Sequence, residues 1–175
     1  MNIWQKLDET NNLVYPWYTF DALDELKTWD VSNWTIFEYG GGYSTLWWRN
    51  KSKKVISIDN NISWCDKMGL IHVDTKDEYI QYPYKYSINN NNVKFDCIII
   101  DGEPIQWRDY CMENALKSIK TGGRIIIDNW KQDTIPDLGS DKWSNTEKLI
   151  SDNNLTYNTY LTKEHQDWKT IVINC

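Results

Sequence analysis

Long apolar runs are absent from this sequence of 175 residues. No segment approaches the roughly 18 to 20 consecutive apolar residues of a membrane-spanning helix, and the first residues lack the pattern of a signal peptide. We therefore expect a protein that has no membrane partner and is cytoplasmic. The many asparagine, lysine and isoleucine residues are typical of an AT-rich genome such as a viral one, in which case the compartment would be the host cytoplasm.

Histidine is scarce, and the cysteines lack a metal-binding spacing. With His72 and His165 as the two histidines, a histidine-based zinc site or a Ser-His-Asp triad is poorly supported, and His72 is expected to be structural. The 4 cysteines include no C-x-x-C pair. Because Cys97 lies in an apolar run and Cys111 in a helical pattern, we expect reduced core thiols and a reducing compartment.

Positive charge is in the minority, with 19 Lys and Arg against 25 Asp and Glu and a net charge of −6. This balance argues against the broad basic face that nucleic-acid binding usually needs. The one basic cluster, residues 49–54, falls where a helix is expected to end, and there it complements the negative end of the helix dipole. A small-molecule substrate is therefore favoured over nucleic acid.

The remaining composition is that of one folded domain. Hydrophobic residues make up 41% and charged residues 25% of the chain, and this length suffices for one core but not for two. We expect residues 1–34 to form an N-terminal extension, in which residues 1–18 wrap the domain and a helix capped by Thr19 reaches Trp29. Residues 35–175 should form the core.

Residues 35–45 carry the strongest functional pattern. A short β-prone run enters Gly40-Gly41-Gly42, and Ser44-Thr45 opens a helical segment. Glycines permit positive φ and the close approach of a ligand, and a helix N-terminus offers unpaired N–H groups. The next strand ends in Asp59, about 20 residues beyond Glu38, which is the separation expected for an acid that binds ribose hydroxyls. The pattern predicts a cradle for a nucleotide-like ligand.

Strand and helix patterns alternate along the rest of the chain. The expected helices are 62–68, 107–120 and 143–152, and the expected strands are 70–73, 97–100, 124–127, 155–161 and 170–173. Gly122-Gly123 is expected to end the second of these helices. Residues 74–93 fit no regular pattern and are expected to form a loop or a shortened helix. The alternation predicts a three-layer α/β/α sandwich.

Acidic residues stand at the ends of four expected strands: Glu38, Asp59, Asp101 and Asp128. Ligands of open parallel sheets bind beyond these carboxyl ends. Asp101 and the pair Asp128-Asn129 follow adjacent strands, and their oxygens suit a Mg²⁺-like ion. The alternative is that Asp128-Asn129 caps the next loop while Asp101 contacts substrate or cofactor.

The sequence Glu38-x-Gly40-Gly41-Gly42-x-Ser44-Thr45, followed by residues 55–59, resembles the S-adenosylmethionine-binding half of a class I methyltransferase. Residues 95–102 and 116–129 are similar to its later motifs, so the resemblance extends from about Tyr15 to the end. It implies a Rossmann-like methyltransferase fold with a mostly parallel seven-stranded sheet in the order 3-2-1-4-5-7-6. It also implies S-adenosylmethionine as the cofactor and O-methylation of a small hydroxylated molecule, such as a sugar or a phenolic.

The resemblance assigns site residues as well. The expected cofactor-binding residues are Glu38, Tyr39, Gly40, Gly41, Gly42, Ser44, Thr45, Asp59, Asn60, Trp64 and Asp101. Asp59 would bind the ribose, Asn60 and Trp64 would lie near the adenine, and Asp74 and Thr75 are further candidates there. Asp101 and Asp128 are the expected catalytic residues. Asp101, Asp128 and Asn129 match the metal ligands of catechol and caffeoyl-CoA O-methyltransferases, where a Mg²⁺ ion lowers the pKa of the substrate hydroxyl.

Some features depart from the catechol-type pattern. Gly102-Glu103-Pro104 stands where those enzymes have a lysine. A group of small methyltransferase-like proteins, with a similar glycine motif and an Asp-Gly after the fourth strand, is the nearer resemblance, and it does not by itself imply a metal. The Asn/Asp-Pro-Pro-Tyr/Phe motif of base-modifying methyltransferases is missing. Trp107, Trp130 and the tyrosines around Pro83 fit an acceptor pocket and core packing equally well.

Two other functions stay open. One is a cofactor-binding module without activity of its own, acting as a partner subunit; a homodimer is a further assembly that stays open for either function. The other is a nicotinamide-dependent oxidoreductase, which the glycine spacing and the absence of a Tyr-x-x-x-Lys pair fit poorly.

Overall fold

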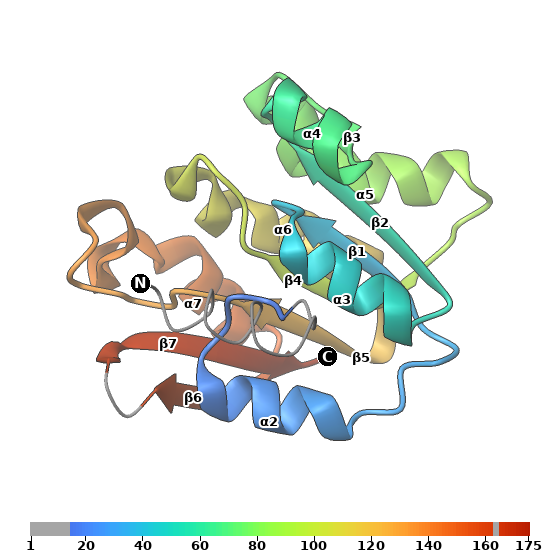
Figure 1. Cartoon of the computed structure of the whole chain (residues 1–175). Helices are drawn as coiled ribbons and strands as arrows, with labels where there is room; N and C mark the ends of the chain where they lie inside the picture. The colour runs from blue at the N-terminus through green and yellow to red at the C-terminus, as the bar shows by residue number, and fades with distance from the viewer. Residues whose placement is uncertain (1–14, 163–164) are drawn as a thin grey trace.

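A seven-stranded sheet organises the computed structural model, which describes residues 15–162 and 165–175 (Figure 1). The strands are β1 (Thr35–Tyr39), β2 (Lys54–Asp59), β3 (Ile71–His72), β4 (Phe95–Ile100), β5 (Ile119–Ile127), β6 (Thr156–Thr162) and β7 (His165–Asn174). They lie in the order β3-β2-β1-β4-β5-β7-β6, and β7 pairs antiparallel with both β5 and β6, whereas the other four pairs are parallel. The predicted mostly parallel sheet and its strand order are confirmed.

Helices cover both faces of the sheet and complete the three layers (Figure 1). They are α2 (Phe20–Thr28), α3 (Tyr43–Lys51), α4 (Ile62–Met68), α5 (Lys76–Asn89), α6 (Arg108–Ser118) and α7 (Ser144–Asp152), with 3₁₀ turns at Ile105–Trp107, Pro136–Leu138 and Ser140–Lys142. Apolar side chains of α2 and α3 pack on one face around Ile36 and Ile99. Those of α5, α6 and α7 pack on the other face around Phe37 and Ile98.

Helix α5 was not predicted from the sequence. Its N-terminus is capped by Thr75, whose hydroxyl accepts a hydrogen bond from the Glu78 N–H at 3.3 Å. Pro83 lies inside the helix, which weakens the local helical pattern. The helix forms nevertheless because Tyr82 and Tyr86 lie one turn apart and pack on aromatic rings of β1 and β4. The prediction of a loop or shortened helix over residues 74–93 was therefore wrong.

The glycine pair after α6 does not end that helix, contrary to the prediction. The helix ends at Ser118, and β5 begins at once because Ile119 pairs with Phe95 of β4. Gly122 lies inside β5 with φ of 78°, and its N–H donates to the Cys175 carbonyl at 2.6 Å. The two glycines therefore lie inside β5, in the stretch where its pairing register with β4 shifts.

The N-cap of α2 differs from its prediction. Thr19 stands at the N-cap position of α2, but its hydroxyl makes no capping hydrogen bond within the described part of the chain. Its N–H instead donates to the Thr170 hydroxyl on β7 at 3.0 Å, which ties α2 to the sheet. Most of the expected wrapping segment, residues 1–14, lies outside the described residues. Over residues 15–162 and 165–175, no helix combines the length and apolarity needed to cross a bilayer.

Candidate functional site

The glycine turn between β1 and α3 is shaped by close packing against neighbouring strand ends. Gly40 has φ of 76°, and a Cβ added there would lie 2.1 Å from the Gly102 Cα. A Cβ at Gly41 would lie 2.8 Å from the Ser57 Cβ. The N–H groups of both glycines donate to the Ile58 carbonyl, at 2.9 and 3.2 Å. These positions thus need glycine, because a larger residue would prevent the turn from packing against the ends of β2 and β4.

Glu38 lies beneath this turn and is fully buried. Its carboxylate accepts hydrogen bonds from the hydroxyls of Ser44 and Thr45 on α3 and from Ser57 on β2, the last at 2.6 Å. Burial raises the pKa of Glu38 to about 7, and the three hydroxyls oppose that rise. The residue therefore joins β1, β2 and the start of α3 below the turn, and a direct contact to a cofactor stays a prediction.

A cavity of about 170 Å³ opens beside the turn. Its lining combines six of the predicted site residues with two aromatic residues that the sequence did not single out: Gly40, Gly41, Gly42, Ser44, Trp64 and Asp101, with Trp17 and Tyr43. The Tyr43 ring centroid lies 6.3 Å from that of Trp17 and 6.2 Å from that of Trp64. Trp64 Nε1 donates to the Gly41 carbonyl at 2.7 Å. The cavity is thus an aromatic-walled hollow with one carboxylate.

The two missed aromatic residues left little signal in the sequence. Tyr43 occupies the variable position between Gly42 and Ser44, and the spacing of that motif says nothing about its side chain. Trp17 belongs to a segment without a helical or strand period and reaches the cavity only through the fold.

Asp59 stands at the end of β2 and is 7% exposed. Its Oδ1 accepts a hydrogen bond from the Asn61 N–H at 2.8 Å, and the Asn61 side chain in turn accepts from the Trp64 N–H at 3.1 Å. Burial raises the pKa of Asp59, against the effect of these backbone hydrogen bonds. Asp59 and Asn60 are not part of the cavity lining, so their contacts with ribose and adenine stay predictions.

Tyr39 and Thr45 are not among the residues that line the cavity. The Tyr39 hydroxyl donates to the Ile80 carbonyl at 2.9 Å within the core. Thr45 accepts a hydrogen bond from the Gly42 N–H at 2.9 Å and binds Glu38. Thr45 thus supports the turn, whereas Tyr39 ties β1 to α5.

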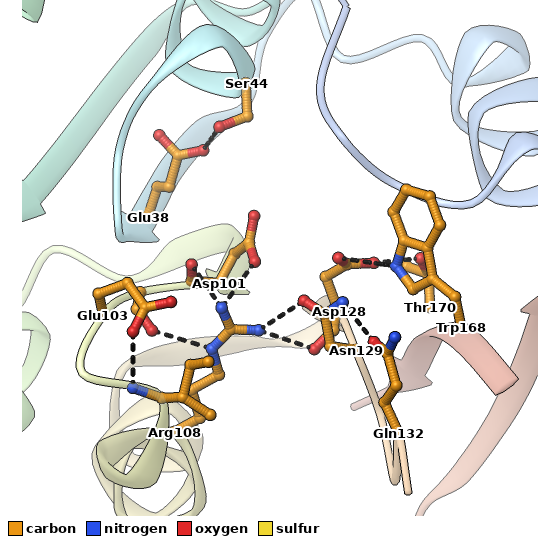
Figure 2. A network of polar contacts seen from close by, with 12 residues as sticks. Glu38, Ser44, Asp101, Glu103, Arg108, Asp128, Asn129, Gln132, Trp168 and Thr170 are labelled. Carbon is orange, nitrogen blue, oxygen red and sulfur yellow. Dashed lines mark hydrogen bonds and ion pairs between the residues drawn. The ribbon is translucent and has the colours of Figure 1, made fainter. Parts of the chain in front are cut away.

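Asp101, just after β4, faces both the cavity and Arg108 (Figure 2). Its Oδ1 lies 3.1 Å from Nη2 of Arg108, and its side chain is 20% exposed, whereas that of Arg108 is 6% exposed. Burial raises the pKa of Asp101, and the guanidinium opposes the rise. Arg108 was not predicted as a site residue, because its position at the start of α6 gives no sequence signal for a contact with two strand ends.

Asp128, just after β5, is 2% exposed and turns toward β7. Its carboxylate accepts hydrogen bonds from Nε1 of Trp168, at 3.1 Å to Oδ2, and from the Thr170 hydroxyl. Burial and the nearby negative charge of Asp101 raise the pKa of Asp128. Asn129 has φ of 55° and directs its side-chain oxygen to Nη1 of Arg108 at 3.0 Å.

The three predicted metal ligands do not converge on a cation position. Asp101 and Asn129 face the guanidinium of Arg108, while the carboxylate of Asp128 faces Trp168 and Thr170 (Figure 2). Within residues 15–162 and 165–175, no group of three His, Cys, Asp or Glu side chains is arranged to hold a metal. The residues in this arrangement therefore do not fit a bound Mg²⁺ ion.

The expected aromatic residues are mostly core. Trp130 is 3% exposed, and Tyr79 is 1% exposed and contacts the ring of Trp107. The Tyr79 hydroxyl has no hydrogen-bond partner among the described residues, and a Cβ at Gly102 would lie 1.7 Å from it. Gly102 thus leaves space for a buried hydroxyl beneath the strand ends.

No protein-family profile matches the chain, and no curated protein sequence does either. Solved structures are similar to it. An O-methyltransferase from Bacillus cereus, solved with S-adenosylhomocysteine, is 18% identical, with a TM-score of 0.64 over 99% of this chain and 97% of that one. MycE methyltransferase of mycinamycin biosynthesis, solved with Mg and S-adenosylhomocysteine, is 15% identical, with a TM-score of 0.63 over 96% of this chain and 53% of that one. An rRNA methylase from Streptococcus thermophilus is 13% identical, with a TM-score of 0.59 over 87% of this chain and 93% of that one.

At these identities the likeness concerns the fold. The chain has the class I, Rossmann-like methyltransferase fold that its sequence predicted. The similar proteins include both O-methyltransferases and rRNA methylases, so the fold by itself leaves the acceptor open.

Proposed function

We propose that this protein is an S-adenosylmethionine-dependent methyltransferase that methylates an oxygen of a small hydroxylated molecule, such as a sugar or a phenolic. The observation that carries the proposal is the cavity between the glycine turn and Asp101. It lies at the carboxyl ends of β1 and β4, the edge at which open parallel sheets bind their ligands. The methyltransferase fold supports the choice of cofactor.

The cavity and the end of β2 would share the cofactor. At about 170 Å³ the cavity is smaller than the roughly 300 to 1,000 Å³ of most small-molecule sites, so of the cofactor it would take only the methionine end, beside Trp64, with the acceptor at its open side. The nucleoside would extend over β2, where Asp59 would accept hydrogen bonds from the ribose hydroxyls and Asn60 would lie near the adenine. Glu38 would contribute indirectly by holding the turn.

Asp101 is the residue best placed to act on the acceptor, because it lines the cavity and its carboxylate is partly exposed. S-adenosylmethionine, when bound, supplies an electrophilic methyl group on a positively charged sulfur. Asp101 would take the proton from the acceptor O–H as that oxygen bonds to the methyl carbon, and the electron pair of the broken carbon–sulfur bond would stay on sulfur. Its raised pKa makes it a stronger base than an ordinary aspartate.

The surroundings of the cavity favour a small cyclic acceptor. Trp17 and Tyr43 form an aromatic wall against which a phenolic ring or the apolar face of a sugar could stack. The net charge of −6 disfavours a polyanionic acceptor.

Calorimetric titration with S-adenosylhomocysteine tests the proposal. We expect a Kd on the order of micromolar, no heat with NADH, and at least a tenfold loss of affinity in Asp59→Asn. The matched control is Asp66→Asn, an exposed acid on α4 that should leave affinity unchanged. Unchanged affinity in Asp59→Asn would contradict the ribose contact.

The remaining outcomes separate the alternatives. Binding of S-adenosylhomocysteine without methyl transfer to any of a panel of phenolics and sugars, until a second protein is added, would favour a cofactor-binding module. Binding of NADH in its place would favour an oxidoreductase. Binding of neither would overturn the proposal.

A further inference from the structure

Arg108 lies between the ends of β4 and β5 (Figure 2). From the sequence, a metal ion was predicted at this position. We infer that its guanidinium is a built-in cation that takes the place of a divalent metal, so that the centre excludes metal ions and methyl transfer needs none. The exclusion of metal stands on the geometry alone, whereas the metal-free reaction rests on the proposed function.

The guanidinium has the oxygen environment that a hard cation would otherwise find. Nε donates to the Gly102 carbonyl at 2.9 Å, and Nη1 donates to the Asp128 carbonyl and to Asn129 Oδ1, both at 3.0 Å. Nη2 donates to the Asp101 carbonyl at 3.0 Å and lies 3.1 Å from Asp101 Oδ1. These acceptors match the five N–H donors of an arginine in number, so the group is bound on all sides.

The local structure holds the acceptors in this arrangement. Asn129 has φ of 55°, a left-handed conformation that asparagine tolerates, and its side-chain nitrogen donates to Gln132 Oε1 at 2.7 Å. Its amide oxygen is thereby fixed toward Arg108, which is the first residue of α6 and is 5% exposed. The Asp128 carbonyl and the Asn129 side-chain oxygen thus act as hydrogen-bond acceptors for Arg108.

Electrostatics then disfavours a second cation. A divalent ion bound to Asp101 or Asn129 would stand within a few ångströms of the guanidinium, and at that distance the repulsion in a buried site is strong. To bind in its place, the ion would have to displace a buried side chain from all of its hydrogen bonds. Because its donors are all used within the chain, Arg108 is a positioning residue that fixes the Asp101 carboxylate at the cavity.

Titration with Mn²⁺, followed by the loss of its free electron paramagnetic resonance signal, tests the exclusion without any cofactor. We expect the wild-type protein to bind no Mn²⁺ at concentrations up to roughly 1 mM, where dedicated carboxylate sites are largely filled. In Arg108→Ala the vacated oxygens of Asp101 and Asn129 should bind Mn²⁺ at least tenfold more tightly. Arg124→Ala, on β5, is the matched control, since the Arg124 side chain donates only to the neighbouring Gly122 and Gly123 carbonyls among the described hydrogen bonds and the variant should behave as wild type.

Each possible result of this titration either supports or overturns the inference. Stoichiometric Mn²⁺ binding by the wild type that is lost in Asp101→Asn would overturn the inference, and so would a folded Arg108→Ala that gains no affinity. Circular dichroism checks folding, and Arg108→Gln, which is neutral but still polar, replaces the alanine variant if that variant is unfolded. If neither variant folds, the wild-type titration alone decides between a metal site and its exclusion.

The metal-free reaction is tested on the wild type with S-adenosylhomocysteine. We expect equal affinity with Mg²⁺ and with EDTA, and equal methyl transfer once an acceptor is known. A tenfold loss in EDTA would overturn a metal-free centre. No binding under either condition would overturn the proposed function instead and leave the Mn²⁺ result standing.

Discussion

Glu38 is a buried acid whose ionisation should be visible in the stability of the protein. Its pKa of about 7 lies above the ordinary value of 4.5, so the folded protein holds this proton more tightly than the unfolded chain does. The free energy of unfolding should therefore fall as pH rises from about 4.5 to about 7, by ~3 kcal/mol at most for this group. We expect Glu38→Gln to lose less stability than wild type between about pH 5 and about pH 8, measured by urea unfolding.

The control for this prediction is Glu113→Gln, an exposed glutamate on α6 that pairs with Lys117. It should keep the wild-type dependence on pH. Asp101 and Asp128, whose pKa values are also raised, leave a residual decrease in both variants. A wild-type slope in Glu38→Gln would mean that the three hydroxyls keep this carboxylate ionised throughout.

At the scale of elements, the contact between the β1–α3 turn and the end of β4 should be sensitive to one methyl group. Gly40 and Gly122 both have positive φ, of 76° and 78°. A Cβ at Gly40 would lie 2.1 Å from the Gly102 Cα, whereas one at Gly122 would have nothing within 4 Å. We expect Gly122→Ala to cost about 1 to 2 kcal/mol, the strain of the backbone alone, and Gly40→Ala to cost well above that.

Thermal or urea unfolding of the two variants measures the difference, with Gly122→Ala as the control for backbone strain. S-adenosylhomocysteine affinity should fall in Gly40→Ala and stay unchanged in Gly122→Ala. Equal destabilisation of the two would contradict a tight contact between the turn and β4.

The elements that could be predicted are those whose sequence pattern is local. Residues 97–100 are apolar without interruption and form part of the strand at the centre of the sheet, and helix 62–68 matches α4. The acids at strand ends were predictable because each lies in the last two residues of its strand or directly after it. Helix α5 was not, because Pro83 obscures a helix that the aromatic packing of Tyr82 and Tyr86 stabilises from a distance.

The site residues that belong to short local motifs could likewise be predicted, and those brought in by the fold could not. The glycine turn and Asp101 lie within short motifs, and both line the cavity. Arg108 and Trp17 reach the same region only because the fold brings α6 and the N-terminal segment to it. Long-range contacts of this kind leave no periodic pattern in a single sequence.

At the scale of the whole molecule, the distribution of charge bears on the acceptor. Acidic side chains stand at the carboxyl ends of β2, β4 and β5, as Asp59, Asp101 and Asp128, and the chain carries a net charge of −6. Arg108, which lies between the ends of β4 and β5, has its donors engaged by the chain. A phosphate backbone at this edge would therefore meet the partly exposed carboxylate of Asp101 and a guanidinium whose donors are already engaged.

This arrangement predicts that the protein does not bind RNA, although an rRNA methylase shares its fold. In a filter-binding measurement at about 50 mM salt, where electrostatic contacts to phosphates are strong, we expect no retention of a ribosomal RNA fragment at protein concentrations up to roughly 100 μM, near the weak end of non-specific affinities. Addition of S-adenosylhomocysteine should not change the result. Retention that falls steeply with salt would contradict this prediction, and the acceptor would then have to be sought among RNAs.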